Sequence, residues 1–340
     1  MRRPPANTAS RPLSRSVSRT HRRRVAGTFP EPAMALKVTN MQDIRDIAVI
    51  GTGIMGAPMA ARLAEAGFPV KAWSRSSEKA AVLAEKGVTQ AATAANAAAH
   101  ADVVLCMLSS APVCAEVLLG ASGVVSRMKP GAVLLVMSSI PVDSAVEQAE
   151  AAKACGIRYV DAPVSGGEKG AIEGTLAIMA GGEQVDVEAL RPLFDCLGRV
   201  THVGPVGCGS LAKLANQLIV ASTICAVAEA LTLVEEGGAD PAQVRHALLG
   251  GFADSTVFRQ HGKRMVEGDF RPGGPAKYQV KDTSTALAFA RSRGLKLPVS
   301  EEVDRLFRSM VEHGAGELDH SGVILEIKRM NAFGGTLETV

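Results

Sequence analysis

Six residues, Gly51 to Gly56, spell Gly-Thr-Gly-Ile-Met-Gly and lie between a short apolar run and a helical pattern. The run at 47–50 is apolar throughout, which is typical of a strand buried in a parallel sheet. The helical pattern starts at Ala57 and ends at Gly67, since a glycine commonly terminates a helix. A GxGxxG spacing between a strand and a helix predicts a dinucleotide-binding unit of the Rossmann type.

The glycines of this loop have separate tasks in such a unit. Gly51 permits the tight turn, Gly53 lets the backbone approach a pyrophosphate, and Gly56 lets helix and strand pack closely. The N-terminus of the following helix then faces the anion. A flexible turn without a ligand is the alternative, but the flanking strand and helix lie where the motif needs them. We therefore expect a cofactor site formed by Gly51, Gly53, Ile54, Met55 and Gly56.

The alternation of strand and helix continues to about residue 204. Apolar runs predict further strands at 70–73, 103–108, 132–137, 158–163, 176–180 and 200–203. This pattern indicates an α/β Rossmann-type domain over 44–204. Ligands of open parallel sheets bind at the carboxyl ends of strands. Met107, Leu108 and Ser138 are therefore expected at the cofactor, and Ser138 also at the substrate.

The residues after the second predicted strand bear on the choice of nicotinamide cofactor. An NAD enzyme usually places an acidic residue there to hold the ribose 2′-hydroxyl, but this chain has Ser74-Arg75-Ser76. A guanidinium beside hydroxyl groups can receive a 2′-phosphate. These residues predict a preference for NADP, with NAD as the second choice. The alternative is that Arg75 is only a solvated loop charge.

From Gly207 onward the patterns are helical, which predicts an all-α C-terminal domain over 205–332 joined to the first by a long interdomain helix. That helix should end at Gly237-Gly238, and Asp240-Pro241 reads as the start of the next. Later helices are expected at 256–267, 279–293, 300–313 and 321–330, followed by a flexible tail at 333–340. The longest apolar stretch, 218–228, is interpreted as too short for a membrane span.

The long helix carries three polar residues near its start. Lys213, Asn216 and Gln217 have i, i+3 and i+4 spacing, so they share one face ahead of an almost entirely apolar stretch. A lysine at the mouth of a buried helix carries a desolvation cost. One reading is that Lys213 is the proton donor of a reductase. The other is a lysine whose stem packs at a helix end while its amine reaches water.

Two other stretches could contribute to a site. Ser165-Gly166-Gly167 offers backbone N–H groups beside a hydroxyl, which suits a carboxylate, although such a tripeptide can be a plain turn. Lys281 opens a predicted helix and is either a solvated charge or a second cation at the nicotinamide or the substrate.

Composition narrows the class of partner. The net charge of +3 comes largely from the N-terminal segment, so no basic face indicates nucleic acid. We expect no membrane partner, and the seven histidines show no ligand spacing, which predicts no metal site. The six cysteines include no CxxC pair, as in a reduced cytoplasmic protein. A helical domain this apolar is expected to form a homodimer or homotetramer.

Residues 1–43 form a separate segment rich in Arg, Ser and Pro, whose first acidic residue is Glu31. Such a composition buries too little apolar surface to fold, so we expect a disordered extension. It also fits an organelle transit peptide, which would change the cytoplasmic assignment. A third interpretation is an upstream start codon, with Met34 or Met41 as the true beginning.

Several strings carry a resemblance to a known family. IGTGIMGAPMA begins at Ile50, DAPVSGGEKGAIEGTLAIMAGG at Asp161, KLANQLIVA at Lys213 and VKD at Val280. In these strings the chain resembles the β-hydroxyacid dehydrogenases (3-hydroxyisobutyrate dehydrogenase-like), over about residues 46–330. It is most similar to the subgroup that reduces tartronate semialdehyde.

The resemblance implies roles for individual residues. Lys213 would be the catalytic lysine, and Asn216 would bind the substrate and steady that lysine. Ser138 and Lys281 would lie at the cofactor and substrate, and Ser165-Gly166-Gly167 would take the substrate carboxylate. Relatives nearest in the subgroup carry an acidic residue at the position of Ser74, and its loss here again favours NADP.

The resemblance also implies an activity, the NAD(P)H-dependent reduction of tartronate semialdehyde to D-glycerate. Within enzymes, the alternatives are 3-hydroxyisobutyrate dehydrogenase and succinic or glyoxylic semialdehyde reductase. The alternative from another class is a non-catalytic sensor that binds NADPH.

Overall fold

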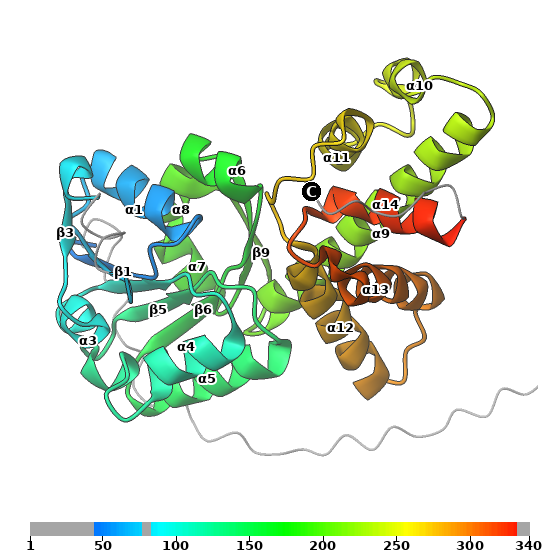
Figure 1. The fold of residues 1–340 in the computed structure, drawn as a ribbon. Helices are drawn as coiled ribbons and strands as arrows, with labels where there is room; N and C mark the ends of the chain where they lie inside the picture. Colours follow the sequence, from blue (N-terminus) through cyan, green and yellow to red (C-terminus); the bar gives the residue numbers. More distant parts are fainter. Residues whose placement is uncertain (1–43, 77–82, 332–340) are drawn as a thin grey trace, which may run out of the picture. The chain divides into compact units, whose positions relative to one another are not determined.

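The first part of the protein is built on a mainly parallel sheet. The computed structural model describes residues 44–76 and 83–331 (Figure 1). The strands follow the spatial order β3-β2-β1-β4-β5-β6-β8-β7, with β9 paired to β8. Their bounds are β1 Ile47–Ile50, β2 Val70–Trp73, β3 Val88–Gln90, β4 Val103–Cys106, β5 Val133–Val136, β6 Arg158–Asp161, β7 Val164–Ser165, β8 Leu176–Gly181 and β9 Gly198–Gly204. The first six strands pair in parallel, and β8 is antiparallel to both β6 and β7.

Helices cover both faces of this sheet, as Figure 1 shows with α1 and α6 on one side and α4 and α5 on the other. Strands such as β1 and β4 are apolar at every position and alternate their side chains between the two faces. Ile47 and Val49 pack in one core cluster, whereas Ala48 and Ile50 pack in another. The helices are α1 Gly56–Glu65, α3 Ala94–Ala98, α4 Ala111–Leu119, α5 Val142–Ala154, α6 Gly167–Glu173, α7 Gln184–Ala189 and α8 Arg191–Leu197.

The structure corrects several predicted strands. Three predicted runs continue past the observed ends of β4, β5 and β6 at Cys106, Val136 and Asp161. The residues beyond those ends form loops at the carboxyl edge of the sheet, the edge at which ligands of such sheets bind. β3 and β7 were not predicted, because β3 has three residues and β7 has two, too few to show a period.

The second part is helical, as the sequence predicts. Among the described residues beyond 207 there is no strand, and the β-type pairing is limited to one isolated bridge between Pro275 and Asp319. The helices are α9 Cys208–Glu236, α10 Pro241–Leu248, α11 Thr256–Glu267, α12 Ala276–Ser292, α13 Pro298–Met310 and α14 Val323–Met330, with short turns at Val311–Ala315 and His320–Gly322. Two predicted starts are set by side-chain caps, since Asp240 accepts from the N–H of Ala242 and Ser255 from that of Phe258.

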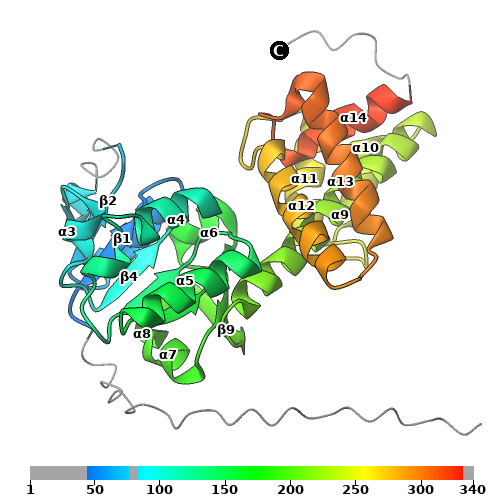
Figure 2. The same ribbon diagram turned by 90° about the horizontal axis from the view of Figure 1, so that it is seen from below.

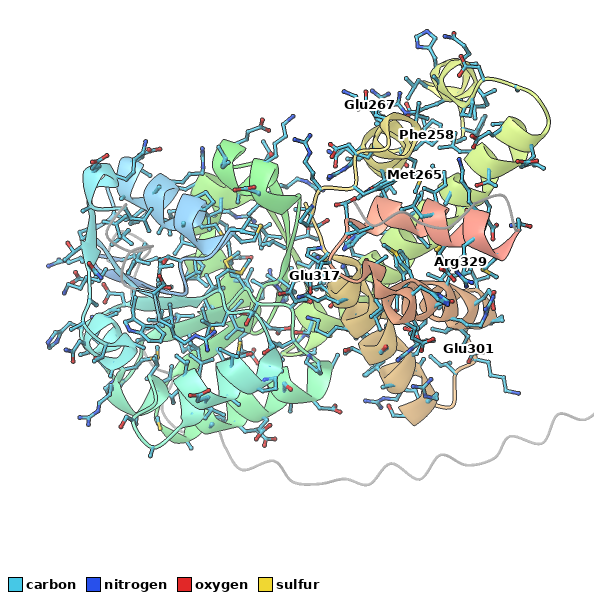
Figure 3. All side chains as sticks on the ribbon, in the orientation of Figure 1. Phe258, Met265, Glu267, Glu301, Glu317 and Arg329 are labelled. Carbon is cyan, nitrogen blue, oxygen red and sulfur yellow. The ribbon has the colours of Figure 1, made fainter. Side chains whose placement is uncertain are left out.

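Helix α9 is the centre of this part. Figure 2 shows α11, α12 and α13 gathered around it, and its buried side chains share one core with Phe258 and Met265 of α11 (Figure 3). With 29 residues, α9 is long and apolar enough to cross a membrane by length and composition alone. The interpretation of its apolar stretch as too short for a span is therefore wrong. The reason is that the helix continues beyond 218–228, with the uncharged residues 214–217 before this stretch and the mainly apolar residues 230–234 after the single charge of Glu229.

Residues 1–43, 77–82 and 332–340 lie outside the described residues. The predictions for the N-terminal extension and for the flexible tail at 333–340 therefore fall there, and both stay predictions.

Candidate active site

The glycine-rich loop joins β1 to α1 with almost no free space on its inner side. Gly51 has φ +101°, and a Cβ there would lie 2.3 Å from the carbonyl oxygen of Met107. A Cβ on Gly56 would lie 1.9 Å from the carbonyl oxygen of Gly51. A Cβ on Gly53, in contrast, would meet nothing within 4 Å. Two glycines thus let the loop close on itself, and the third faces open space.

This loop fits the pyrophosphate of a dinucleotide. The N-terminus of α1 has no side-chain cap and no acidic residue in its first turn, so its N–H groups can serve an anion. Ile54 is 67% exposed beside the open space at Gly53. The hydroxyl of Thr52 is buried and has no hydrogen-bond partner among the described residues. The loop residues therefore suit a nicotinamide dinucleotide.

The end of β2 lies beside the loop, because the N–H of Gly51 donates to the carbonyl oxygen of Trp73 at 2.8 Å. Ser74, Arg75 and Ser76 follow at once, with Arg75 exposed and the two serines half-buried. A dinucleotide whose pyrophosphate lies on the loop would direct its adenosine ribose toward this edge. The three residues thus lie at the edge of the sheet beside the glycine-rich loop, and their recognition of a 2′-phosphate stays a prediction.

Lys213 lies in the second turn of α9 and is half-buried. Its Nζ donates to the carbonyl oxygen of Val164 at 2.8 Å, which connects α9 to the β6–β7 segment. Burial lowers the pKa of Lys213 from its ordinary value. The carboxylate of Asp282 opposes this effect, and the ammonium of Lys281 adds to it.

A chain of polar contacts lies on the same face of α9 as Lys213. The amide of Asn216 donates to Gln217 Oε1 at 2.8 Å, and Gln217 Nε2 donates to Asp282 Oδ2 at 2.7 Å. Asp282 Oδ1 lies 3.0 Å from Lys281 Nζ, which also donates to the carbonyl oxygen of Ser139 at 3.3 Å. These contacts join Asn216, Gln217, Asp282 and Lys281 in one network. Lys213 has its own hydrogen bond to Val164 and lies near enough to Asp282 and Lys281 for their charges to act on its pKa.

The predicted carboxylate cradle directly follows the residue that Lys213 contacts. Ser165 ends β7, Gly166 has φ +140°, and Gly167 starts α6 with φ +62°. The N-terminus of α6 has no side-chain cap hydrogen bond, although Glu168 lies in its first turn, so the predicted carboxylate cradle depends on the N–H groups of 165–167. The ammonium of Lys213 thus contacts Val164, and the N–H donors of 165–167 directly follow that residue. This arrangement suits a substrate with both a carbonyl and a carboxylate.

Ser138 differs from the expectation of direct contact. It is only 1% exposed, and its Oγ accepts from the N–H of Leu108 at 2.7 Å. Because the residue is covered, its hydroxyl joins the ends of β4 and β5 instead of facing a ligand. Met107 and Leu108 are half-buried and lie against Gly51, at the loop where the cofactor is expected.

The sequence interpretation missed three contributors. The carboxylate of Asp282 could have been suspected from its place next to Lys281, whereas nothing local indicates that it meets Gln217. The carbonyl groups of Val164 and Ser139 leave no sequence signal at all, because every residue has one. Among the described residues there is no group of three or more His, Cys, Asp or Glu side chains that could hold a metal ion.

Comparisons with known proteins agree with this geometry. Residues 46–204 match the model of the NAD binding domain of 6-phosphogluconate dehydrogenase. Residues 207–327 match the model described as NAD-binding of NADP-dependent 3-hydroxyisobutyrate dehydrogenase.

Two relatives are similar over most of their length. The chain is 39% identical to 2-hydroxy-3-oxopropionate reductase from Escherichia coli (strain K12), over 84% of this chain and 97% of that one. It is 33% identical to 2-(hydroxymethyl)glutarate dehydrogenase from Eubacterium barkeri, over 82% and 93%.

A crystal structure of 3-hydroxyisobutyrate dehydrogenase from Salmonella typhimurium superposes with a TM-score of 0.77 at 28% identity, over 83% of this chain and 99% of that one. The family models, the relatives and the fold lead to the same assignment. The chain belongs to the 3-hydroxyisobutyrate dehydrogenase-like family and is an NAD(P)-dependent oxidoreductase that acts on the CH–OH group of hydroxyacids.

Proposed function

We propose that this protein reduces tartronate semialdehyde to D-glycerate and that NADPH is its preferred cofactor. The observation that carries the proposal is the contact of Lys213 Nζ with Val164, directly before the Ser165-Gly166-Gly167 cradle. A substrate with an aldehyde next to a carboxylate-bearing carbon would place its carbonyl at the amine and its carboxylate at the cradle. The 39% identity to a 2-hydroxy-3-oxopropionate reductase supports the same substrate.

When bound at the glycine-rich loop, the cofactor supplies a hydride. The N–H groups of 165–167 bind the carboxylate and Asn216 binds the hydroxyl, which together orient the substrate. The ammonium of Lys213 donates a hydrogen bond to the carbonyl oxygen as negative charge develops there and then transfers its proton. One hydride and one proton thus convert the aldehyde to a primary alcohol, and Lys213 regains its proton from solvent.

A panel of semialdehydes tests the proposal, with NADPH oxidation followed at 340 nm in each case. We expect kcat/KM for tartronate semialdehyde to exceed that for succinic semialdehyde, glyoxylate and methylmalonate semialdehyde by about 10-fold or more, since a site that binds a hydroxyl discriminates against analogues without it. A preference for methylmalonate semialdehyde would identify a 3-hydroxyisobutyrate dehydrogenase instead. Tight NADPH binding without turnover of any aldehyde would identify a sensor.

The rate of reduction should fall as the pH rises through the pKa of Lys213. Burial lowers this pKa from the ordinary value for lysine, and only the protonated amine can donate. The kcat is therefore full below the pKa in the folded enzyme and falls about tenfold per pH unit above it. Oxidation of D-glycerate, which needs the neutral amine, should show the opposite limb. A kcat for reduction that stays flat through pH 10.5, the ordinary value, would contradict this role.

Arg75 should set the preference between the two cofactors. We expect Arg75→Ala to lower kcat/KM with NADPH by about 10- to 100-fold, the size of one lost charge-assisted contact, and to leave the value with NADH nearly unchanged. Arg127→Ala is the control, because this arginine lies in a separate turn at Val125–Arg127. If Arg75→Ala lowered both values equally, the arginine would not recognise the 2′-phosphate.

We further propose that the protein forms a homodimer or homotetramer through α9. Uncharged residues about one turn apart leave an exposed stripe along this helix, with Ile219 67% and Leu233 73% exposed. The stripe consists of Leu211, Ala215, Ile219, Ala226, Ala230 and Leu233. Its small residues allow a second copy to approach closely, and a two-fold axis near Ser222 would place Leu211 against the partner copy's stripe. Light scattering should show a multimer, and Ile219→Glu should reduce its mass; a monomeric wild type would contradict the proposal.

A further inference from the structure

A buried carboxylate that is not part of the network of Asn216, Gln217, Asp282 and Lys281 accepts hydrogen bonds from the start of α9. Asp161 ends β6 and is 0% exposed. Its Oδ1 accepts from the N–H of Gly207 at 2.8 Å, and its Oδ2 accepts from the N–H of Ser210 at 2.7 Å. Gly207 directly precedes α9, and the first N–H groups of this helix have no partner within the helix. Asp161 therefore caps α9 from a strand that lies 46 residues earlier than Gly207 in the chain.

The junction around this carboxylate has no free space. A Cβ on Gly209 would lie 2.2 Å from the carbonyl oxygen of Asp161 and 2.5 Å from that of Met179. A Cβ on Gly181 would lie 2.6 Å from Asp161 Oδ1. The first turn of α9 thus touches the backbone of β6 and β8 directly. A shift of the carboxylate would have to move the helix.

The same short segment holds the reacting groups. Asp161 binds the first turn of α9, and three residues later the carbonyl oxygen of Val164 accepts from Lys213 Nζ. The predicted cradle, 165–167, follows immediately. Residues 161–167 therefore fix the start of the helix, its amine and the carboxylate donors relative to one another.

We propose that Asp161 is a positioning residue, which holds Lys213 Nζ at a set place beside the cradle through its two hydrogen bonds to the N-terminus of α9. This inference rests on the proposed role of Lys213 as the proton donor. Displacement of a reacting group by about 1 Å can cost about 100-fold in rate, so a fixed helix start matters to the reaction. Asp161 itself touches neither the cradle nor the amine through its carboxylate.

Asp161→Asn is the sharpest variant, because it keeps the size of the side chain. A carboxylate accepts at both oxygens, whereas an amide accepts at one atom and donates at the other, where it would meet an N–H group. One of the two bonds is therefore lost and α9 must move. We expect kcat to fall by about 10- to 100-fold. The KM for NADPH should stay within about 2-fold, since the glycine-rich loop is not involved.

Asp186→Asn is the matched control. Asp186 is 7% exposed and accepts from Arg158 Nη1 at 3.0 Å, so this variant also loses a buried carboxylate contact, but at β6 and α7 and not at α9. We expect its kcat to equal that of the wild type, whatever its loss in Tm. If both variants lost kcat in proportion to Tm, Asp161 would have a merely structural role and the proposal would be overturned.

A readout without substrate separates this inference from the proposed activity. The rate at which an amine-reactive acylating reagent labels Lys213 can be followed against pH by mass spectrometry. Release of the amine from Val164 would return it to solvent, where burial no longer lowers its pKa. The midpoint, which is the pH at which the labelling rate is half-maximal, should therefore rise in Asp161→Asn and stay unchanged in Asp186→Asn. An unchanged midpoint in Asp161→Asn would overturn the inference even if the wild type reduced tartronate semialdehyde. A shifted midpoint in an enzyme inactive on every aldehyde would overturn only the proposed function.

A second variant covers the case in which Asp161→Asn does not fold, and Ser210→Pro is unsuitable for this purpose. In Ser210→Pro the N–H of Ser210 would be replaced by a ring carbon that collides with Asp161 Oδ2, so Asp161→Ser is used in its place: the shorter side chain fits the tight junction and offers one hydroxyl acceptor where the carboxylate offers two oxygens. We expect the same fall in kcat and the same upward shift in the labelling midpoint. Wild-type behaviour in both measurements would count against Asp161 as a positioning residue.

Discussion

Replacement of Lys213 by alanine should lower the kcat for semialdehyde reduction by about 100-fold or more, which is the usual contribution of a general acid. The amine of Lys213 is a titratable donor beside the predicted cradle 165–167, and its Nζ lies 2.8 Å from the carbonyl oxygen of Val164. The affinity for NADPH should stay near normal, because the glycine-rich loop between β1 and α1 does not include α9. Stopped-flow measurement of single turnovers would separate the chemical step from product release.

Lys169→Ala is the matched control for this variant. Lys169 lies in α6, close to the cradle in sequence, but its side chain is 77% exposed and it makes only an i,i+4 ion pair with Glu173 at 3.8 Å. Loss of such a surface pair has little effect. We therefore expect wild-type kcat from Lys169→Ala. If Lys213→Ala kept more than a tenth of the wild-type kcat, another group would have to supply the proton.

Gly56→Ala should lower the stability of the fold, whereas Gly53→Ala should weaken cofactor binding, although both change one glycine of the same motif. A Cβ on Gly56 would lie 1.9 Å from the carbonyl oxygen of Gly51, so α1 must move away from β1. We expect a loss of roughly 3 kcal/mol in the free energy of unfolding, the upper end for overpacking of a core. A Cβ on Gly53 meets nothing within 4 Å, so Gly53→Ala should keep the Tm of the wild type.

The cost of Gly53→Ala should appear in cofactor binding. The added methyl group lies on the open side of the loop, where the backbone must approach the pyrophosphate. We expect the Kd for NADPH to rise by about 10-fold or more, which corresponds to about 1.4 kcal/mol. Thermal unfolding with and without NADPH measures both effects, since only the wild type should gain a large shift in Tm. An unchanged Kd would show that the pyrophosphate does not lie at Gly53.

Particular residues show how far the sequence alone could go. The glycine-rich loop was predictable because its function depends on contacts within about twenty residues, and Gly51, Gly53 and Gly56 each behave as the motif requires. Helix α11 has the predicted bounds of Thr256–Glu267 because its cap and its terminating glycine are both local signals. β7 could not be predicted, since two residues form a strand only when a neighbouring strand pairs with them.

The site itself shows the opposite case. From the helix pattern alone, a lysine whose amine reaches water at a helix end was the favoured interpretation of Lys213, and only the resemblance reversed this in favour of a catalytic group. The structure places its amine against Val164, 49 residues away, and joins Lys281 to Ser139 across 142 residues. Ser138 lies at a strand end as predicted, yet packing covers it and leaves its hydroxyl to the N–H of Leu108.

The sequence by itself determined the α/β and all-α parts, the dinucleotide loop and the presence of a polar face on α9, because hydrophobic period, glycine position and capping act between near neighbours. Only the tertiary structure decided which carbonyl groups meet the two lysines, and that the carboxylate of Asp161 caps α9. Those contacts involve backbone groups, which every residue has, and they join positions far apart in the chain. No residue type therefore predicts them, and they form only once the sheet and the helices have packed.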